Sequence, residues 1–168
     1  MGVLIKMDSI NIYTDGGYRG SVEIGAYAYT LEYKGHSDDG GEASMETTNN
    51  KEELKAVIYA LKRLKTEDIP VKVYTDSKYV IGCAVEWIDK WRGNNYHKKG
   101  GLKNRELIIE LDKQVRRQED IEFIHVKGHS GVEGNEKVDA LVNRLMDDFI
   151  AQMDNDEFMK YTTNLLND

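Results

Sequence analysis

The chain of 168 residues has very little cysteine and proline. Cys83 is its one cysteine, so no disulfide can form within the chain, and its apolar neighbours favour a buried structural thiol over a nucleophile. A reducing compartment is therefore compatible with the sequence. Pro70 is the one proline, and 40% of the residues are hydrophobic and 32% charged, which is typical of a globular protein and excludes a fibrous or disordered one.

Long hydrophobic runs are also missing. No segment approaches the length of a membrane span. The amino terminus is too short for the apolar part of a secretory signal, and Lys6 stands where a myristoylation signal has Ser or Thr. We therefore expect a cytoplasmic protein without membrane contact, of a size that suits one domain.

Positive charge is scarce overall but concentrated in one place. The formal net charge is −7, which argues against indiscriminate binding of nucleic acid. Residues 90–105, here called the basic segment, carry six bases and no acid, which leaves 17 bases against 30 acids in the other residues. A basic patch on an acidic body indicates directed contact with a polyanion, although a solvated loop would have the same composition. Aromatic rings at Trp87, Trp91 and Tyr96 favour nucleic acid, because flat rings pack on sugars and bases.

The periodicity of apolar residues predicts an α/β fold with five strands. Alternating or β-branched runs predict strands at 10–14, 25–33, a stretch ending near 47, 71–75 and 121–126. Helical spacing predicts helices at 54–64, from Ser77 onwards, around 107–111 and over 138–149. Three strands followed by alternation of strands and helices indicate a mixed sheet with helices packed on it.

Four carboxylates lie where solvated acids are not expected. Asp15 and Asp76 are each predicted one residue beyond a strand, and Glu53 and Asp139 lie on or beside the apolar stripes of two helices. Each has an ordinary explanation, as a turn residue, a helix cap or an acid in a first helical turn. Four such acids brought together would repel one another and lose solvation, so a hard divalent cation is expected to hold them.

The sequence resembles ribonuclease H of type 1 from about residue 8 to residue 150. Six motifs in the family's order and spacing carry this resemblance: Tyr-Thr-Asp-Gly-Gly at 13–17, Thr-Thr-Asn-Asn-Lys-Glu-Glu-Leu at 47–54, Tyr-Thr-Asp-Ser-Lys-Tyr-Val at 74–80, Trp-Ile-Asp-Lys-Trp at 87–91, Val-Lys-Gly-His-Ser-Gly at 126–131 and Gly-Asn-Glu-Lys-Val-Asp at 134–139. The resemblance implies a ribonuclease H-like fold, a five-stranded mixed sheet with helices on both faces. It also implies a catalytic domain at 1–150, which leaves an acidic tail at 151–168.

By the same resemblance the chain would hydrolyse the RNA strand of an RNA/DNA hybrid, giving 5′-phosphate and 3′-hydroxyl ends. Two Mg²⁺ ions about 4 Å apart, with Mn²⁺ as a substitute, would create the nucleophile and neutralise the developing charge. The family's metal-binding acids fall on Asp15, Glu53, Asp76 and Asp139, and Asp15 is expected to bridge the ions. The family's loop histidine falls on His129, where it would transfer a proton to the leaving oxygen or assist product release.

The resemblance also implies contacts with the hybrid, whose 2′-hydroxyls distinguish the RNA strand. Asn49 and Asn50 would reach the minor groove, although a helix cap is the alternative for both. Tyr79 and Trp87 would pack against the sugars of the DNA strand, although Trp87 and Trp91, taken alone, would more often be core residues. Thr48 and Asn104 are expected to form a pocket for a phosphate of the DNA strand. Further contacts with the hybrid are expected at Gly16, Lys78, Lys98 and Lys99.

Three departures from the family's pattern affect the expected grip on substrate. The turn after Gly16 lacks the family's Asn-Pro-Gly run, Glu46 stands near the phosphate pocket where a base often occurs, and the basic segment is about two residues shorter than in bacterial members. We expect a monomer.

Two other functions remain as alternatives to a ribonuclease. One is a catalytically silent hybrid-binding module on this fold, and the other is a Ca²⁺-binding regulatory domain, which would need a short contiguous ligand loop that the sequence lacks.

Overall fold

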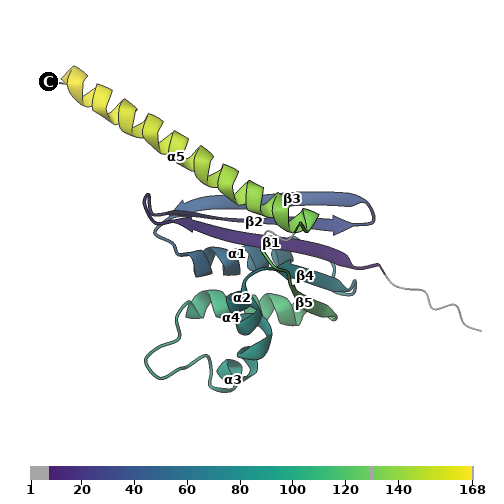
Figure 1. Cartoon of the computed structure of the whole chain (residues 1–168). Helices are drawn as coiled ribbons and strands as arrows, with labels where there is room; N and C mark the ends of the chain where they lie inside the picture. Colours follow the sequence, from purple (N-terminus) through teal and green to yellow (C-terminus); the bar gives the residue numbers. More distant parts are fainter. Residues whose placement is uncertain (1–7, 129–130, 168) are drawn as a thin grey trace, which may run out of the picture.

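The structure, a computed structural model, describes residues 8–128 and 131–167, except for the side chains of residues 157, 158 and 160–167. Five strands form one mixed sheet in the order β3-β2-β1-β4-β5 (Figure 1). The three strands that come first in the chain are antiparallel, and β4 and β5 extend the sheet in parallel with β1. The strands span Ile10–Arg19 (β1), Ile24–Tyr33 (β2), His36–Met45 (β3), Val71–Thr75 (β4) and Ile121–His125 (β5).

Helices cover both faces of this sheet, as the fold class predicted (Figure 1). Helices α1 and α4 lie together on one face, and α5 crosses the other. The helical elements span Asn49–Lys62 (α1), Lys78–Ile81 (α2), a π-helical turn at Gly82–Glu86 (η1), Ile88–Gly93 (α3), Arg105–Arg117 (α4) and Glu133–Asn167 (α5).

Two hydrophobic cores hold these layers together. The larger lies between the sheet and α1 and α4, where side chains such as Ile12, Leu54 and Ile108 are buried. Tyr27, Tyr29, Leu31 and Tyr33 of β2 all contribute to it, which confirms the prediction that they share one face. The smaller core lies under α5 and consists of Ile24, Ala26, Ala28, Val138, Val142 and Met146.

Asp15 lies inside β1 and not beyond its end, so the predicted position was wrong. β1 continues to Arg19, and Asp15 is paired with Ala28 of β2. The glycines that suggested a turn serve close packing instead, because a Cβ on Gly16 would lie 2.4 Å from the backbone nitrogen of Glu53. Gly16 thus allows α1 to lie directly on β1.

Helix α5 extends well beyond the sheet (Figure 1). Its apolar side chains pack on the smaller core as far as Phe149, Ile150 and Met153, and the helix continues without a break through residue 150. The division of the chain at residue 150 therefore remains a prediction.

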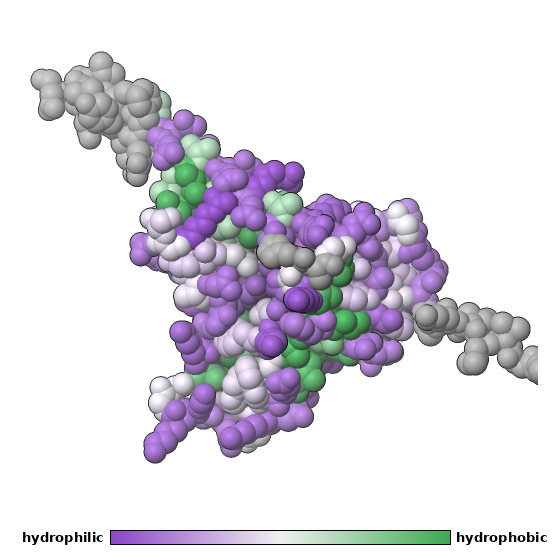
Figure 2. All heavy atoms as spheres, in the orientation of Figure 1, coloured by the Kyte–Doolittle hydropathy of each residue, from purple (hydrophilic) through white to green (hydrophobic). Residues whose placement is uncertain are grey.

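Hydrophilic side chains cover most of the face drawn in Figure 2. Within the described residues, no helix combines the length and apolar character that a membrane crossing requires.

Candidate functional site

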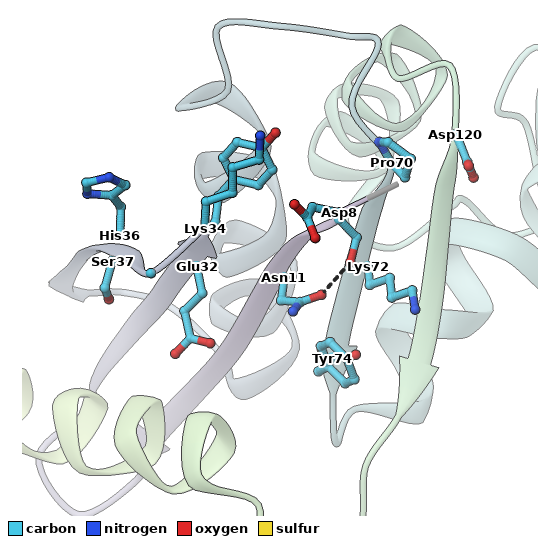
Figure 3. A pocket seen from close by; sticks show the side chains of 13 residues that line it. Asp8, Asn11, Glu32, Lys34, His36, Ser37, Pro70, Lys72, Tyr74 and Asp120 are labelled. Atoms are coloured by element: carbon cyan, nitrogen blue, oxygen red, sulfur yellow. Dashed lines mark hydrogen bonds between the residues drawn. The ribbon is translucent and has the colours of Figure 1, made fainter. Parts of the chain in front are cut away.

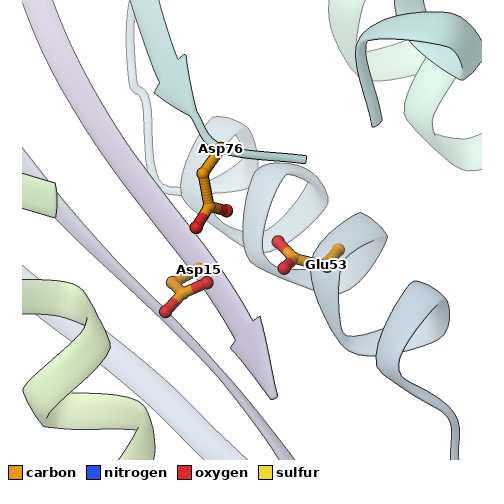
Figure 4. Close-up of side chains that lie close together, drawn as sticks. All are labelled: Asp15, Glu53 and Asp76. Atoms are coloured by element: carbon orange, nitrogen blue, oxygen red, sulfur yellow. The ribbon is translucent and has the colours of Figure 1, made fainter. Parts of the chain in front are cut away.

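Three of the four predicted carboxylates meet at one point of the sheet. Asp15 is in the middle of β1, Glu53 in the first turns of α1, and Asp76 directly after β4 (Figure 4). One oxygen from each carboxylate lies within 4.8 Å of the others. Residues far apart in sequence therefore present oxygen ligands to one small volume.

Strand register and helix packing create this convergence. β1 and β4 run in parallel with Tyr13 beside Tyr74. Asp15 within β1 and Asp76 directly after β4 each follow these tyrosines by two residues, so they lie at the same level of the sheet. The rings of these tyrosines stack with their centroids 4.7 Å apart, which supports that alignment. The close contact at Gly16 brings Glu53 of α1 to the same level.

Burial makes the cluster costly without a cation. Asp15 is 7% exposed and Glu53 5%. Asp15 Oδ1 accepts a hydrogen bond of 2.9 Å from the Gly16 amide, whereas Glu53 Oε2 is buried without a donor in the described part of the chain. A buried carboxylate oxygen without a partner is unfavourable, and a metal ion at this position would satisfy it.

The charges in the cluster shift its acid–base behaviour. Burial, followed by the charges of Asp76 and Asp139, raises the pKa of Asp15 to about 8. Burial, followed by the charges of Asp15 and Asp76, raises the pKa of Glu53 well above its ordinary value. Asp139 therefore lies close enough for its charge to act on Asp15. A cluster of three mutually repelling carboxylates, with Asp139 beside Asp15, fits a hard divalent cation with oxygen ligands.

The predicted histidine, His129, lies outside the described residues. The residue before it, Gly128, lies beside the acidic cluster. A Cβ on Gly128 would lie 3.1 Å from Asp76 Oδ2. A second histidine, which was not predicted as a site residue, lies nearby: the Nε2 of His125 is 3.2 Å from the backbone oxygen of Asp76. Its position could have been foreseen, because it ends β5 directly beside Thr75 at the end of β4.

The residues expected to touch the minor groove surround the start of α1. Thr48 is the helix cap, since its side chain accepts a hydrogen bond of 3.2 Å from the Lys51 amide. The alternative that Asn49 or Asn50 caps the helix is therefore wrong; both lie within the first turn, Asn49 exposed and Asn50 half-buried. Their side chains thus remain available for other contacts.

The predicted aromatic platform forms a surface beside the basic segment. Trp87 is 41% exposed, and its ring lies 6.4 Å from that of Tyr79 and 5.7 Å from that of Trp91, measured between centroids. The alternative in which Trp87 is a core residue is therefore wrong. A cavity of about 400 Å³ runs along these rings and is also lined by Lys98. Lys78 lines a neighbouring cavity with Trp87, whereas Lys99 is exposed on the loop after α3.

The two residues expected to bind a DNA phosphate line one cavity. Thr48 and Asn104 belong to the walls of a space of about 560 Å³ where α1 and α4 both begin. Asn104 has a left-handed backbone with φ of 61° and donates a hydrogen bond of 2.9 Å to the Tyr79 hydroxyl. Glu46 also lines this cavity, in agreement with its expected place near the phosphate pocket.

A larger cavity of about 850 Å³ lies away from the acidic cluster (Figure 3). Its walls come from β1, β2 and β4, with Asn11, Glu32, Lys72 and Tyr74 among the lining residues. The residues that line it include both acids and bases, and none of the clustered carboxylates is among them. Size alone therefore does not identify the functional site, and the convergence of carboxylates does.

Comparison with known proteins places this arrangement in context. The family model described as RNase H matches residues 7–146. Two curated proteins named Ribonuclease H are similar, one from Ruthia magnifica with 41% identity over 84% of this chain and 97% of its own, and one from Clostridium botulinum with 42% identity over 85% and 99%. Among solved structures, LC9-RNase H1, described as a type 1 RNase H with the type 2 active-site motif, is 25% identical with a TM-score of 0.74, covering 86% of this chain and 74% of that one.

Proposed function

Since this chain belongs to the ribonuclease H family, we propose that it hydrolyses the RNA strand of RNA/DNA hybrids as an endonuclease and leaves 5′-phosphate and 3′-hydroxyl ends. Members of this family are nucleases and generally depend on metal ions. The observation that carries the proposal is the convergence of Asp15, Glu53 and Asp76 within 4.8 Å, beside Asp139.

The residues of the cluster suit a pair of Mg²⁺ ions, with Mn²⁺ as a substitute. Asp15, Glu53, Asp76 and Asp139 would hold them, and the donor-free Oε2 of Glu53 supports a ligand at that point. Ions held there would supply activation of the attacking water at neutral pH and neutralisation of charge on the attacking and leaving oxygens. Burial of Asp15 and Glu53 fixes the direction of their oxygens, so the attacking water and the scissile phosphate would be held in a defined geometry.

His129 is proposed to donate a proton to the leaving 3′-oxygen. The loop that carries it begins at Gly128 beside Asp76, which supports a position near the reacting phosphate. An imidazole suits this task, because its ordinary pKa lies close to neutrality.

Selection of the hybrid would depend on three surfaces around the acidic cluster. Asn49, Asn50 and the backbone at Gly16 would contact the minor groove, where 2′-hydroxyls mark the RNA strand. Tyr79 and Trp87 would pack against deoxyribose, and Lys78, Lys98 and Lys99 would contact phosphates. Thr48 and Asn104 would hold one phosphate of the DNA strand in the cavity between α1 and α4.

A cleavage assay on end-labelled substrates tests the proposal. The purified chain is incubated with an RNA/DNA hybrid in Mg²⁺, in Mn²⁺ and in chelator, with duplex DNA and single-stranded RNA as control substrates. We expect metal-dependent cleavage of the hybrid's RNA strand alone, with 5′-phosphate ends on the products. Binding of the hybrid without metal-dependent cleavage would instead support the silent binding module.

A further inference from the structure

Glu52, the residue before the clustered Glu53, is fully buried and belongs to a separate network. Its Oε1 accepts hydrogen bonds from Thr47 Oγ1 at 2.5 Å and from Ser44 Oγ at 3.2 Å. The third donor is Lys55, whose Nζ lies 2.9 Å away. Glu52 thus ties one turn of α1 to the end of β3 and fixes the position of a lysine.

Lys55 extends from this network to the cavity that Thr48 and Asn104 line. Its side chain is 24% exposed, and Nζ also lies 3.4 Å from Ser44 Oγ. An ammonium group has three N–H donors, and these two contacts use two of them. The third has no partner among the described residues, so it can serve a ligand in the cavity.

The cavity as a whole suits an anion. Its walls carry the four bases Lys51, Lys55, Lys103 and Arg105 against the two acids Glu46 and Glu106. Helices of 14 and 13 residues begin there, and the start of a helix adds partial positive charge and free backbone N–H groups.

Stability does not explain why this pair is charged. Burial of an ion pair costs about as much in desolvation as the pair regains, and apolar side chains of similar volume are often as stable or more so. Glu52 Oε2 has no donor within the described residues, which adds to that cost. A lysine held by a buried carboxylate is, however, an ordered cation that loses little side-chain entropy when it binds an anion.

We propose that Lys55 binds a phosphate of the DNA strand and that Glu52 is the residue that positions it. This inference rests on the proposed function. It accounts for Glu46, which brings an acid to a place where a base is usual in the family, because Lys55 supplies the missing positive charge from α1.

Three variants separate the binding role from a structural one. Lys55→Gln removes the cation and leaves a buried carboxylate, Glu52→Gln keeps the cation, and the double variant removes both charges. Lys62→Gln, on the same helix but outside this cavity, is the matched control. The melting temperature should be lowest in Lys55→Gln and largely restored in the double variant. Hybrid affinity, in contrast, should stay weakened in both variants.

The salt dependence of hybrid binding gives the number of phosphate contacts. It is measured by the anisotropy of a labelled hybrid in the presence of chelator. Both variants that lack Lys55 should show a log–log slope lower by about 0.7 to 0.9, so that a fourfold rise in salt weakens their binding about 3-fold less than the parent's. Glu52→Gln should keep the parent slope, because the cation remains, but it should weaken hybrid binding, because the lysine loses the carboxylate that positions it. Lys62→Gln should change neither the slope nor the affinity, and parent affinity in Glu52→Gln would contradict the positioning role. An unchanged slope in Lys55→Gln would overturn the proposal.

Hybrids with a single methylphosphonate identify the strand. At one position of the DNA strand, the neutral linkage should weaken the parent and cause no further loss in Lys55→Gln. Additive losses at every DNA position, or matching losses on the RNA strand, would refute the assignment to DNA phosphate. Absence of hybrid cleavage by the parent chain would instead contradict the proposed function, so the two failures are distinguishable.

Discussion

Asp15 is the residue on which the proposed chemistry most depends, because the other clustered carboxylates surround it. Asp15→Asn should reduce cleavage to background while hybrid binding is kept or improved, since the amide weakens metal binding but no longer repels phosphate. The melting temperature of the metal-free protein should not fall, because one of several like charges is removed. Single-turnover cleavage, anisotropy and thermal unfolding measure these effects, with the exposed Asp120→Asn as control. Mg²⁺-dependent turnover near the parent rate would exclude Asp15 from the metal site.

His129 should matter less than the carboxylates, because a bound water can also deliver a proton. His129→Ala should slow turnover by roughly 10- to 100-fold without abolishing it, within the usual contribution of a positioned acid or base. The pH profile of turnover, from about pH 6 to about pH 9, spans the range over which an imidazole titrates. His36→Ala, an exposed histidine at the start of β3, serves as control. A profile identical to the parent's would leave the loop a structural role only.

At the scale of elements, the basic segment, which runs from α3 to the first residue of α4, is expected to add affinity and not rate. Lys98→Ala, Lys99→Ala and Lys103→Ala combined should raise the Michaelis constant and lower the log–log salt slope by roughly 2 to 3, for three lost phosphate contacts. The turnover number should change little, because none of these lysines belongs to the acidic cluster. A variant with Lys62, Lys65 and Lys113 changed to Ala has the same loss of charge elsewhere. Equal slopes in the two variants would mean that the basic segment is only a solvated surface.

The elements themselves show what the sequence could predict. β4 was predicted to the residue, because Pro70 marks its start and apolar residues alternate through Val71–Thr75. The position of Asp15 was missed, since Gly16 and Gly17 are typical of turns and only the packing of α1 reveals that they continue a strand. Glu52 and Lys55 escaped notice for a related reason: charges three residues apart on a helix usually face solvent, and the burial of Glu52 against the sheet is a tertiary property.

At the scale of the whole molecule, the acidic cluster should make stability depend on pH in an unusual direction. The pKa of Asp15 is about 8 in the folded protein, against about 3.9 in an unfolded chain. Between these values the folded state keeps a proton that the unfolded state releases, so the free energy of unfolding should fall as pH rises, by at most about 1.4 kcal/mol per pH unit for this one proton. Below about pH 4 both states are protonated and this loss is absent.

Urea unfolding of the metal-free protein from about pH 4 to about pH 8 measures the effect, with Asp15→Asn as the matched variant. The difference in unfolding free energy between parent and variant should grow in favour of the variant as pH rises. Added Mg²⁺ should raise the parent's stability most at the upper end of this range, because it binds the deprotonated carboxylates. A difference that is independent of pH would mean that Asp15 is ionised throughout.

The extension of α5 poses the last question at this scale, namely whether the end of the chain contributes to the body. Met153 is the last residue in the described part of α5 that packs against the smaller core. Deletion of residues 155–168 leaves that contact intact and removes three acids and one base. We therefore expect an unchanged turnover number and a melting temperature close to the parent's, with hybrid affinity unchanged or slightly higher because less negative charge repels the substrate. A longer deletion from residue 149 provides the contrast, since it removes Phe149, Ile150 and Met153 from the core and should lower the melting temperature by several degrees. Equal destabilisation by the two deletions would contradict this division and show that the final residues stabilise the domain.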